Sequence, residues 1–100
     1  MNAREFFESL EERSDGSKVA GIEHTYLFEV AGEGTWLVAV HGGKVRVTEG
    51  TGDADVTISL SGETFEALAA RRQSPAIAYM RGRLKVSGDT SAALKLQKLF

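Results

Sequence analysis

The sequence predicts an α+β fold, in which a five-stranded, largely antiparallel sheet is covered on one face by helices. Five segments alternate apolar and polar residues with a period of two, which is typical of half-buried strands. Glycine-containing turns separate the first strands, and helical spacing of apolar residues occurs before, between and after the strand segments. The chain has 100 residues and no internal repeat, so residues 1–100 are expected to form one domain.

The first thirteen residues are predicted to form an amphipathic helix. Charged residues occupy most of its circumference, and one apolar stripe recurs at three- and four-residue spacing: Ala3, Phe6, Phe7 and Leu10. Asp15-Gly16 then indicates a loop over residues 14–18.

Four strands follow, and a fifth lies nearer the C-terminus. Their predicted bounds are residues 22–31, 35–40, 44–48, 55–60 and 83–87. Gly32-Glu33-Gly34 turns the chain after the first strand, and Gly42-Gly43 is a two-residue hairpin signal because both positions tolerate a positive φ. The first three strands are therefore expected to form an antiparallel meander.

Three more helices are predicted in the second half of the chain. Ser61 is a good N-cap for a helix that continues to Arg71, and Pro75 suits the first turn of a short helix ending near Met80. Thr90 or Ser91 is expected to cap a last helix running to the C-terminus.

Composition excludes several classes of function. The formal net charge is −2 and no long Lys/Arg block is present, so nucleic acid is a poor candidate partner. Cysteine is absent, which excludes disulfides, thiolate metal sites and thiol nucleophiles. The N-terminus is too charged for a signal peptide, and no apolar run approaches the roughly 18 residues that span a bilayer. A soluble, cytoplasmic protein without stable membrane insertion is expected.

No constellation of residues predicts catalysis or metal binding. His24 and His41 have no third ligand at close spacing, and no serine lies in a G-x-S-x-G arrangement. The segment from Gly32 to Thr35 lacks the lysine of a phosphate-binding loop and precedes a strand instead of a helix. We therefore expect a protein that is not an enzyme and has no cofactor and no metal site.

Aromatic residues occur in nearly every predicted element. They suit a packed core, and they equally suit the wall of a cavity that accepts an apolar molecule. Periodicity alone does not distinguish these two interpretations.

The second half of the chain resembles the sterol carrier protein type 2 family of nonspecific lipid-transfer domains. The resemblance is carried by the strand at residues 55–60, the helix after it, the segment AYMRGRLKVSGD at 78–89 and the closing ALKLQKLF at 93–100. The order of elements agrees over nearly the whole chain, and the first 20 residues match only as an apolar-faced helix. The ending Lys98-Leu99-Phe100 departs from the Ser-Lys-Leu-type peroxisomal address of eukaryotic relatives.

The resemblance implies an elongated apolar tunnel between sheet and helices that takes fatty acids, acyl-CoA esters, sterols or phospholipids. The residues expected to line it are Phe28, Trp36, Phe65, Leu68, Ile77, Met80, Leu84, Leu96, Leu99 and Phe100. Among these, Met80 and Phe100 are favoured, because Met adapts to varied shapes and a chain end can move as a gate.

The sequence thus predicts intracellular binding and transfer of lipids in an apolar cavity. A second interpretation stays open, in which the cavity is collapsed and the domain serves as an interaction module. It would then form a homodimer or work with a partner enzyme, since members of the resembled family occur fused to enzymes. Leu27 and Leu37, on an otherwise polar face of the sheet, are the candidate contact for such a partner.

Overall fold

The computed structural model describes residues 2–13 and 19–99. Its helices are α1 (Ala3–Arg13), α2 (Gly62–Ala69), α3 (Pro75–Met80), α4 (Thr90–Leu94) and the 3₁₀ turn η1 (Leu96–Leu99). Its strands are β1 (His24–Ala31), β2 (Gly34–His41), β3 (Lys44–Glu49), β4 (Val56–Ser61) and β5 (Leu84–Gly88). None of the helices in these two ranges is both long enough and apolar enough to cross a membrane.

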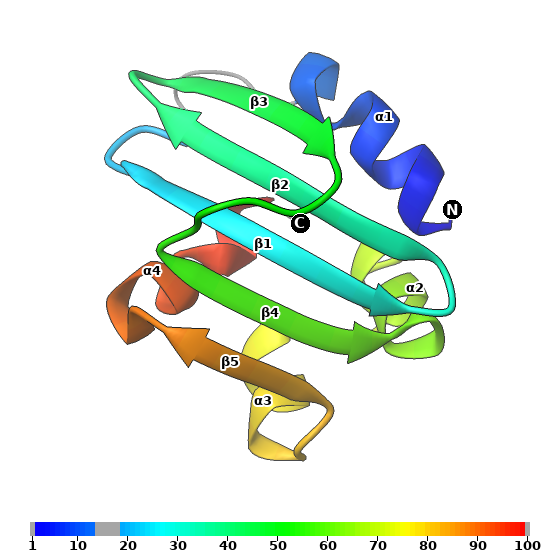
Figure 1. Cartoon of the computed structure of the whole chain (residues 1–100). Helices are drawn as coiled ribbons and strands as arrows, with labels where there is room; N and C mark the ends of the chain where they lie inside the picture. Colours follow the sequence, from blue (N-terminus) through cyan, green and yellow to red (C-terminus); the bar gives the residue numbers. More distant parts are fainter. Residues whose placement is uncertain (1, 14–18, 100) are drawn as a thin grey trace.

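The five strands form one sheet in the order β3-β2-β1-β4-β5 (Figure 1). The pairs β1–β2, β2–β3 and β4–β5 are antiparallel, whereas β1 and β4 are parallel. The predicted meander is confirmed. Its Gly42-Gly43 turn has φ values of 58° and 76°, as a hairpin turn with two left-handed residues requires.

The parallel pair exists because the chain crosses the sheet between β3 and β4. This crossover, residues 50–55, runs over the face opposite the helices (Figure 1). Its ends are anchored by hydrogen bonds from the Gly50 amide to the Thr35 carbonyl (2.8 Å) and from the Asp55 amide to the Thr25 carbonyl (2.9 Å).

The same crossover covers the apolar pair on the outer face of the sheet. Leu27 and Leu37 are opposite each other in the β1–β2 register, as neighbours on one face. A Cβ on Gly52 would lie 3.0 Å from Leu37 Cδ2, so the crossover passes directly over this side chain. Leu27 is buried and Leu37 partly buried. This pair therefore offers little surface to a partner.

The main core lies between the sheet and the helices, and its densest part is an aromatic cluster around Phe7. The Phe7 ring stacks on Trp36 with centroids 4.9 Å apart. It also contacts Phe28 at 5.2 Å and Phe6 and Phe65 at 5.3 Å each. All five side chains are at most 2% exposed. The helix predicted from the N-terminal stripe is thus confirmed, and its apolar side closes the core over β2 and β3.

The predicted Ser61 cap and the helix start at Pro75 are confirmed, Ser74 caps the helix at Pro75, and the predicted cap of the last helix is wrong. Ser61 and Ser74 accept hydrogen bonds from the amides three residues ahead. The last helix is capped by Asp89, because its carboxylate accepts from two amides, those of Ser91 (2.9 Å) and Ala92 (3.2 Å). This helix also ends early, at Leu94, where the hydrogen bonds from Lys95 onward tighten to a 3₁₀ pattern.

Replacing Gly88 by alanine is expected to lower the free energy of unfolding by at least about 2 kcal/mol. Gly88 has φ +112°, and a Cβ there would overlap the carbonyl oxygen of Asp55. Gly50 has the similar φ of +122° with open space around it, so Gly50→Ala serves as the matched control for backbone strain alone. Urea unfolding of both variants measures the difference, and equal losses would contradict a steric role for Gly88.

Candidate lipid-binding groove

An uncharged groove of about 370 Å³ lies where α3, β5 and α4 meet. Its lining side chains are Pro75, Ala76, Tyr79 and Met80 from α3, Leu84 and Val86 from β5, and Thr90, Ala93, Leu94 and Gln97 from the C-terminal helices. Ligand sites for apolar molecules are typically concave, of several hundred Å³, and apolar apart from a few polar groups. Thr90, Gln97 and the Tyr79 hydroxyl are the polar groups here.

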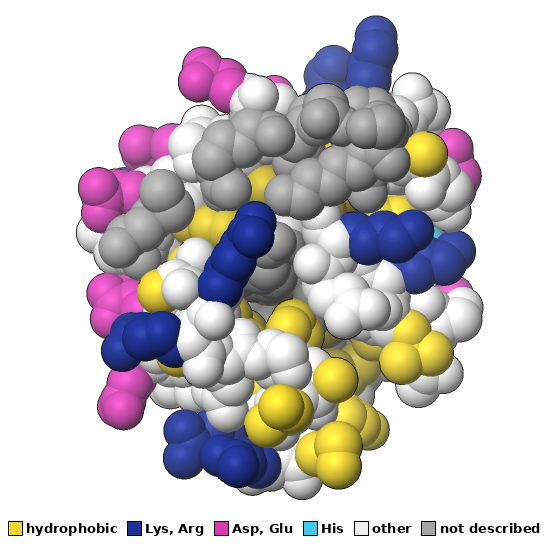
Figure 2. Space-filling view, turned by 180° about the vertical axis from the view of Figure 1, so that it is seen from behind, with side chains coloured by type: hydrophobic (Ala, Val, Ile, Leu, Met, Phe, Trp, Pro, Cys, Tyr) yellow, Lys and Arg dark blue, Asp and Glu magenta, His cyan; other side chains and the backbone are white. Residues whose placement is uncertain are grey.

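Large apolar side chains stand exposed around this groove. Met80 is 83% exposed, Leu94 77% and Tyr79 56%. In Figure 2 hydrophobic side chains gather toward the lower edge of the molecule, the edge at which Figure 1 places α3. Exposed apolar groups gathered at one place indicate an interaction site, whereas scattered ones are ordinary.

One buried hydrogen bond and the N-cap of α4 fix the wall that this helix contributes. The hydroxyl of Tyr26, which is fully buried on β1, donates to the carbonyl oxygen of Ala92 at 2.6 Å. Hydrogen bonds from the Ser91 hydroxyl and the Ala92 amide hold the pKa of Asp89 below its ordinary value, so the capping carboxylate stays charged. The position of α4 is therefore set by the sheet and by its own first turn.

Because of Tyr26, the stability of this wall is expected to decrease at alkaline pH. Burial, with the nearby Asp89 and Asp55 carboxylates, raises the pKa of Tyr26 to about 12 from an ordinary value of about 10. Because the folded pKa is the higher one, the stabilisation is complete below pH 10 and is lost as the pH rises through 12.

Replacing Tyr26 by phenylalanine is therefore expected to have two effects. At neutral pH the free energy of unfolding should fall by about 1 kcal/mol, because the hydrogen bond to Ala92 is lost. Between pH 10 and 12 the variant should lose less stability than the parent protein. Denaturant unfolding at several pH values measures both, with Tyr79→Phe as the control for an exposed phenol. Parallel stability curves for parent and Tyr26→Phe would contradict the assignment.

The residues predicted to line a cavity separate into two groups in the structure. Met80 and Leu84 lie in the groove, and Ile77 lies on the other side of α3 beside a second hollow. The remaining described side chains are at most 2% exposed in the main core: Phe28, Trp36, Phe65, Leu68 and Leu99. The side chain of Leu96 and all of Phe100 lie outside the described residues.

Sequence reasoning did not single out most of the groove. Ala76, Tyr79, Val86, Ala93 and Leu94 were not among the predicted wall residues. The sequence did contain an indication for Leu94. It is a large apolar residue that lies outside the apolar stripe of the last helix, where a polar residue is expected. The structure shows that it faces the groove and solvent.

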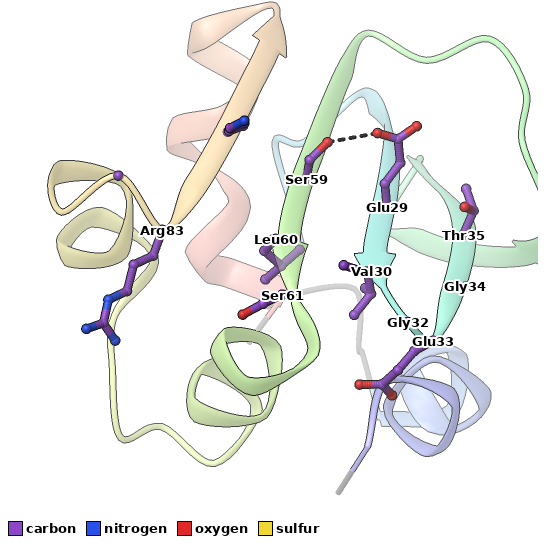
Figure 3. A pocket seen from close by; sticks show the side chains of 13 residues that line it. Glu29, Val30, Gly32, Glu33, Gly34, Thr35, Ser59, Leu60, Ser61 and Arg83 are labelled. Carbon is purple, nitrogen blue, oxygen red and sulfur yellow. Dashed lines mark hydrogen bonds between the residues drawn. The ribbon is translucent and has the colours of Figure 1, made fainter.

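A larger hollow on the other face of β5 has a different chemistry, since Arg83 and Lys85 line it where Leu84 and Val86 line the groove. It has a volume of about 700 Å³ and is lined by the ends of β1 and β4 and by the start of β2. In Figure 3 the Ser59 hydroxyl donates to Glu29 at 2.8 Å, while Arg83 points away from this pair. Glu33, on the turn after β1, accepts from the Ala3 amide at 3.0 Å and so is engaged in holding α1. Charged side chains along this hollow make it unsuited to an alkyl chain.

The histidines form separate pairs with carboxylates. His41 Nδ1 lies 3.0 Å from Glu23 Oε2, and His24 Nδ1 lies 3.8 Å from Asp55 Oδ2. The Gly42 amide and His41 lower the pKa of Glu23. Within residues 2–13 and 19–99, no group of three His, Cys, Asp or Glu side chains is placed to hold a metal ion.

The fold and the groove define a small α+β domain with an apolar site at one end of its helical layer. The chain matches the model of the SCP-2 sterol transfer family over residues 5–100, and it belongs to this family. The family resemblance found in the sequence is thereby confirmed, as is the predicted fold class.

The proteins similar to this chain include structures of nearly its own length and segments of much longer proteins. Human hydroxysteroid dehydrogenase-like protein 2 is 33% identical over 100 residues, which cover 96% of this chain and 24% of that protein. The sterol carrier protein domain 2 of Helicoverpa armigera has a TM-score of 0.76 at 28% identity, covering 95% of this chain and 82% of that one. A sec-alkylsulfatase from Pseudomonas sp. has a TM-score of 0.77 at 27% identity, covering 94% and 15%. The chain thus spans about a quarter of the dehydrogenase-like relative.

Proposed function

We propose that this domain binds and transfers a single lipid, whose apolar part occupies the groove between α3, β5 and α4. The observation that carries the proposal is an uncharged groove of about 370 Å³ surrounded by exposed Tyr79, Met80 and Leu94. Membership of the SCP-2 sterol transfer family supports it. The activity proposed is carriage without catalysis.

Hydrophobic burial alone is sufficient for useful affinity. Each buried CH₂ contributes about 0.8 kcal/mol, so a dozen contribute on the order of 10 kcal/mol. Immobilising the lipid subtracts several kcal/mol or more. The remainder corresponds to a dissociation constant in the micromolar range without a dedicated polar contact. Fatty acid, acyl-CoA, sterol and phospholipid are all compatible with such a site.

The lining suits ligands of varied shape. Met80 is unbranched and adjusts to different surfaces, and α3 is a short helix with a mostly exposed outer side. The floor, in contrast, is formed by Leu84 and Val86 on a paired strand. A firm floor with an adaptable rim favours broad selectivity over recognition of one lipid.

Titration with a fluorescent fatty-acyl probe tests this function. Delipidated protein is expected to saturate near one probe per chain, and unlabelled fatty acid, acyl-CoA and sterol are then added as competitors. Displacement by a competitor would identify the preferred lipid class. Absence of saturable binding at high micromolar probe would refute the proposal.

A second candidate function is docking to an enzyme domain, with the groove closed by the partner. The observation favouring it is that the matched segment forms about a quarter of the dehydrogenase-like relative and 15% of the sulfatase. The exposed side chains around the groove would then be a contact surface, with self-association of the isolated chain as a related outcome. Concentration-dependent mass in analytical ultracentrifugation, with no uptake of probe, would favour this function over lipid carriage.

A further inference from the structure

Charge is distributed very unevenly along the chain. Residues 67–88 contain five basic side chains, Arg71, Arg72, Arg81, Arg83 and Lys85, and no acidic one. Because the whole chain carries −2, all other residues together carry −7. A net charge of −2 is therefore compatible with a segment that carries +5. Its basic residues are spaced along the chain, so they do not form a long Lys/Arg block in the sequence.

Four of these basic side chains come together in space. Arg71, Arg72, Arg81 and Arg83 line one hollow of about 620 Å³, together with the apolar side chains of Ile77 and Pro75. No acidic residue lines it. All four arginines are exposed, and within the described ranges none forms an ion pair with a carboxylate. Arg83 also lines two neighbouring hollows, one with Glu63 and one with Glu29 and Glu33, so Arg71, Arg72 and Arg81 are the arginines whose hollows contain no carboxylate.

The arginine hollow and the apolar groove lie on the two sides of α3. They share Pro75 and Gln97 as lining residues, so they meet at the start of α3 and at η1. Exposed apolar side chains lie on α3 just after Pro75: Ile77 is 47% exposed, Tyr79 56% and Met80 83%. Figure 2 shows Lys and Arg side chains beside the hydrophobic side chains at the lower edge of the molecule.

We propose that this surface, formed by the α2–α3 turn, α3 and the start of β5, docks the domain on membranes that contain anionic lipids. The arginines would contact lipid headgroups, while Met80 and Tyr79 would enter the boundary between headgroups and acyl chains. The mouth of the groove would then face the bilayer. The role of this docking, which is to deliver or collect a lipid, rests on the proposed function. Docking itself needs no bound lipid.

Physical principles favour a membrane surface over a free anion as the occupant. Basic and large apolar side chains presented together are the combination that binds at the membrane interface. A free anion would use the arginines and leave Ile77, Tyr79 and Met80 in water. The acidic remainder of the chain is repelled by anionic lipids, which orients the molecule with α3 toward the membrane.

Co-sedimentation of the full chain with vesicles tests the proposal. The vesicles are phosphatidylcholine alone and phosphatidylcholine with phosphatidylserine. Binding is expected only to the second kind and should be lost at about 1 M salt, where the Debye length is about 3 Å. The test variant is Arg81→Gln/Arg83→Gln, and the matched control is Lys44→Gln/Arg46→Gln, which removes two exposed charges from β3 at the opposite edge of the sheet.

The arginine variant is expected to bind the anionic vesicles about 25-fold more weakly, about fivefold for each arginine. The β3 control should bind like the parent protein, and Met80→Ser should weaken binding without changing its salt dependence. Equal weakening by both charge variants, or equal binding to both kinds of vesicle, would overturn the proposal. The absence of vesicle binding would also overturn the proposal. This includes a result in which the arginine substitutions weaken binding only of a soluble anion or of a partner protein. Probe titration without vesicles reports separately on the proposed lipid carriage.

Discussion

Replacing Phe7 by alanine is expected to lower the free energy of unfolding by about 3–5 kcal/mol. Phe7 contacts Phe6, Phe28, Trp36 and Phe65, all with ring centroids between 4.9 and 5.3 Å. Its removal leaves a cavity whose walls belong to α1, α2 and two paired strands, so little collapse can fill it. For a domain of this size the melting temperature should fall by about 12 °C or more.

Thermal unfolding followed by circular dichroism measures this loss. The matched control is Tyr79→Ala, which removes an aromatic ring that is 56% exposed. That variant should change the free energy of unfolding by no more than about 0.5 kcal/mol. If the two variants were destabilised equally, the aromatic cluster would not be the centre of the core.

Replacing Ala76 by tryptophan is expected to weaken binding of the fatty-acyl probe at least about tenfold, which is 1.4 kcal/mol of binding free energy. Ala76 is an exposed position on α3 that lines the groove, so an indole there fills space the lipid needs. Because Ala76 lies outside the buried core, the variant should fold with nearly unchanged stability.

The control for this variant is Ala70→Trp. Ala70 is also exposed but follows α2, and it lines neither the groove nor the arginine hollow. Probe titration of both variants separates a local block from a general effect of adding an aromatic residue. Unchanged affinity in Ala76→Trp would place the lipid elsewhere.

Much of the fold is predictable from local chemistry. The Gly42-Gly43 turn, the Ser61 cap and Pro75 at the start of α3 each act within a few residues, and each is confirmed. The parallel pairing of β1 with β4 is not local, because it depends on a crossover whose anchors, Thr25 and Thr35, lie in other strands. Residues 50–55 of this crossover have no periodic pattern from which their course over the sheet could be predicted.

The candidate site was less predictable, for a related reason. Periodicity identifies which face of an element is apolar but not how deep each side chain lies. Phe65 and Met80 both suited a cavity wall in the sequence, yet Phe65 is fully buried and Met80 is 83% exposed. The difference arises because α2 packs against α1 and the centre of the sheet, whereas α3 packs at its edge, on β5.

The central claim is that the lipid occupies the groove between α3, β5 and α4, and chemical-shift mapping tests it most directly. Uniformly ¹⁵N-labelled protein is titrated with palmitate, and the amide shifts are followed to saturation. The largest changes are expected at Ala76, Met80, Val86, Ala93 and Leu94, with the indole NH of Trp36 nearly unmoved. Large changes at Trp36 and Phe65 with an unperturbed α3 would contradict the claim, since they would mean that the lipid enters the main core.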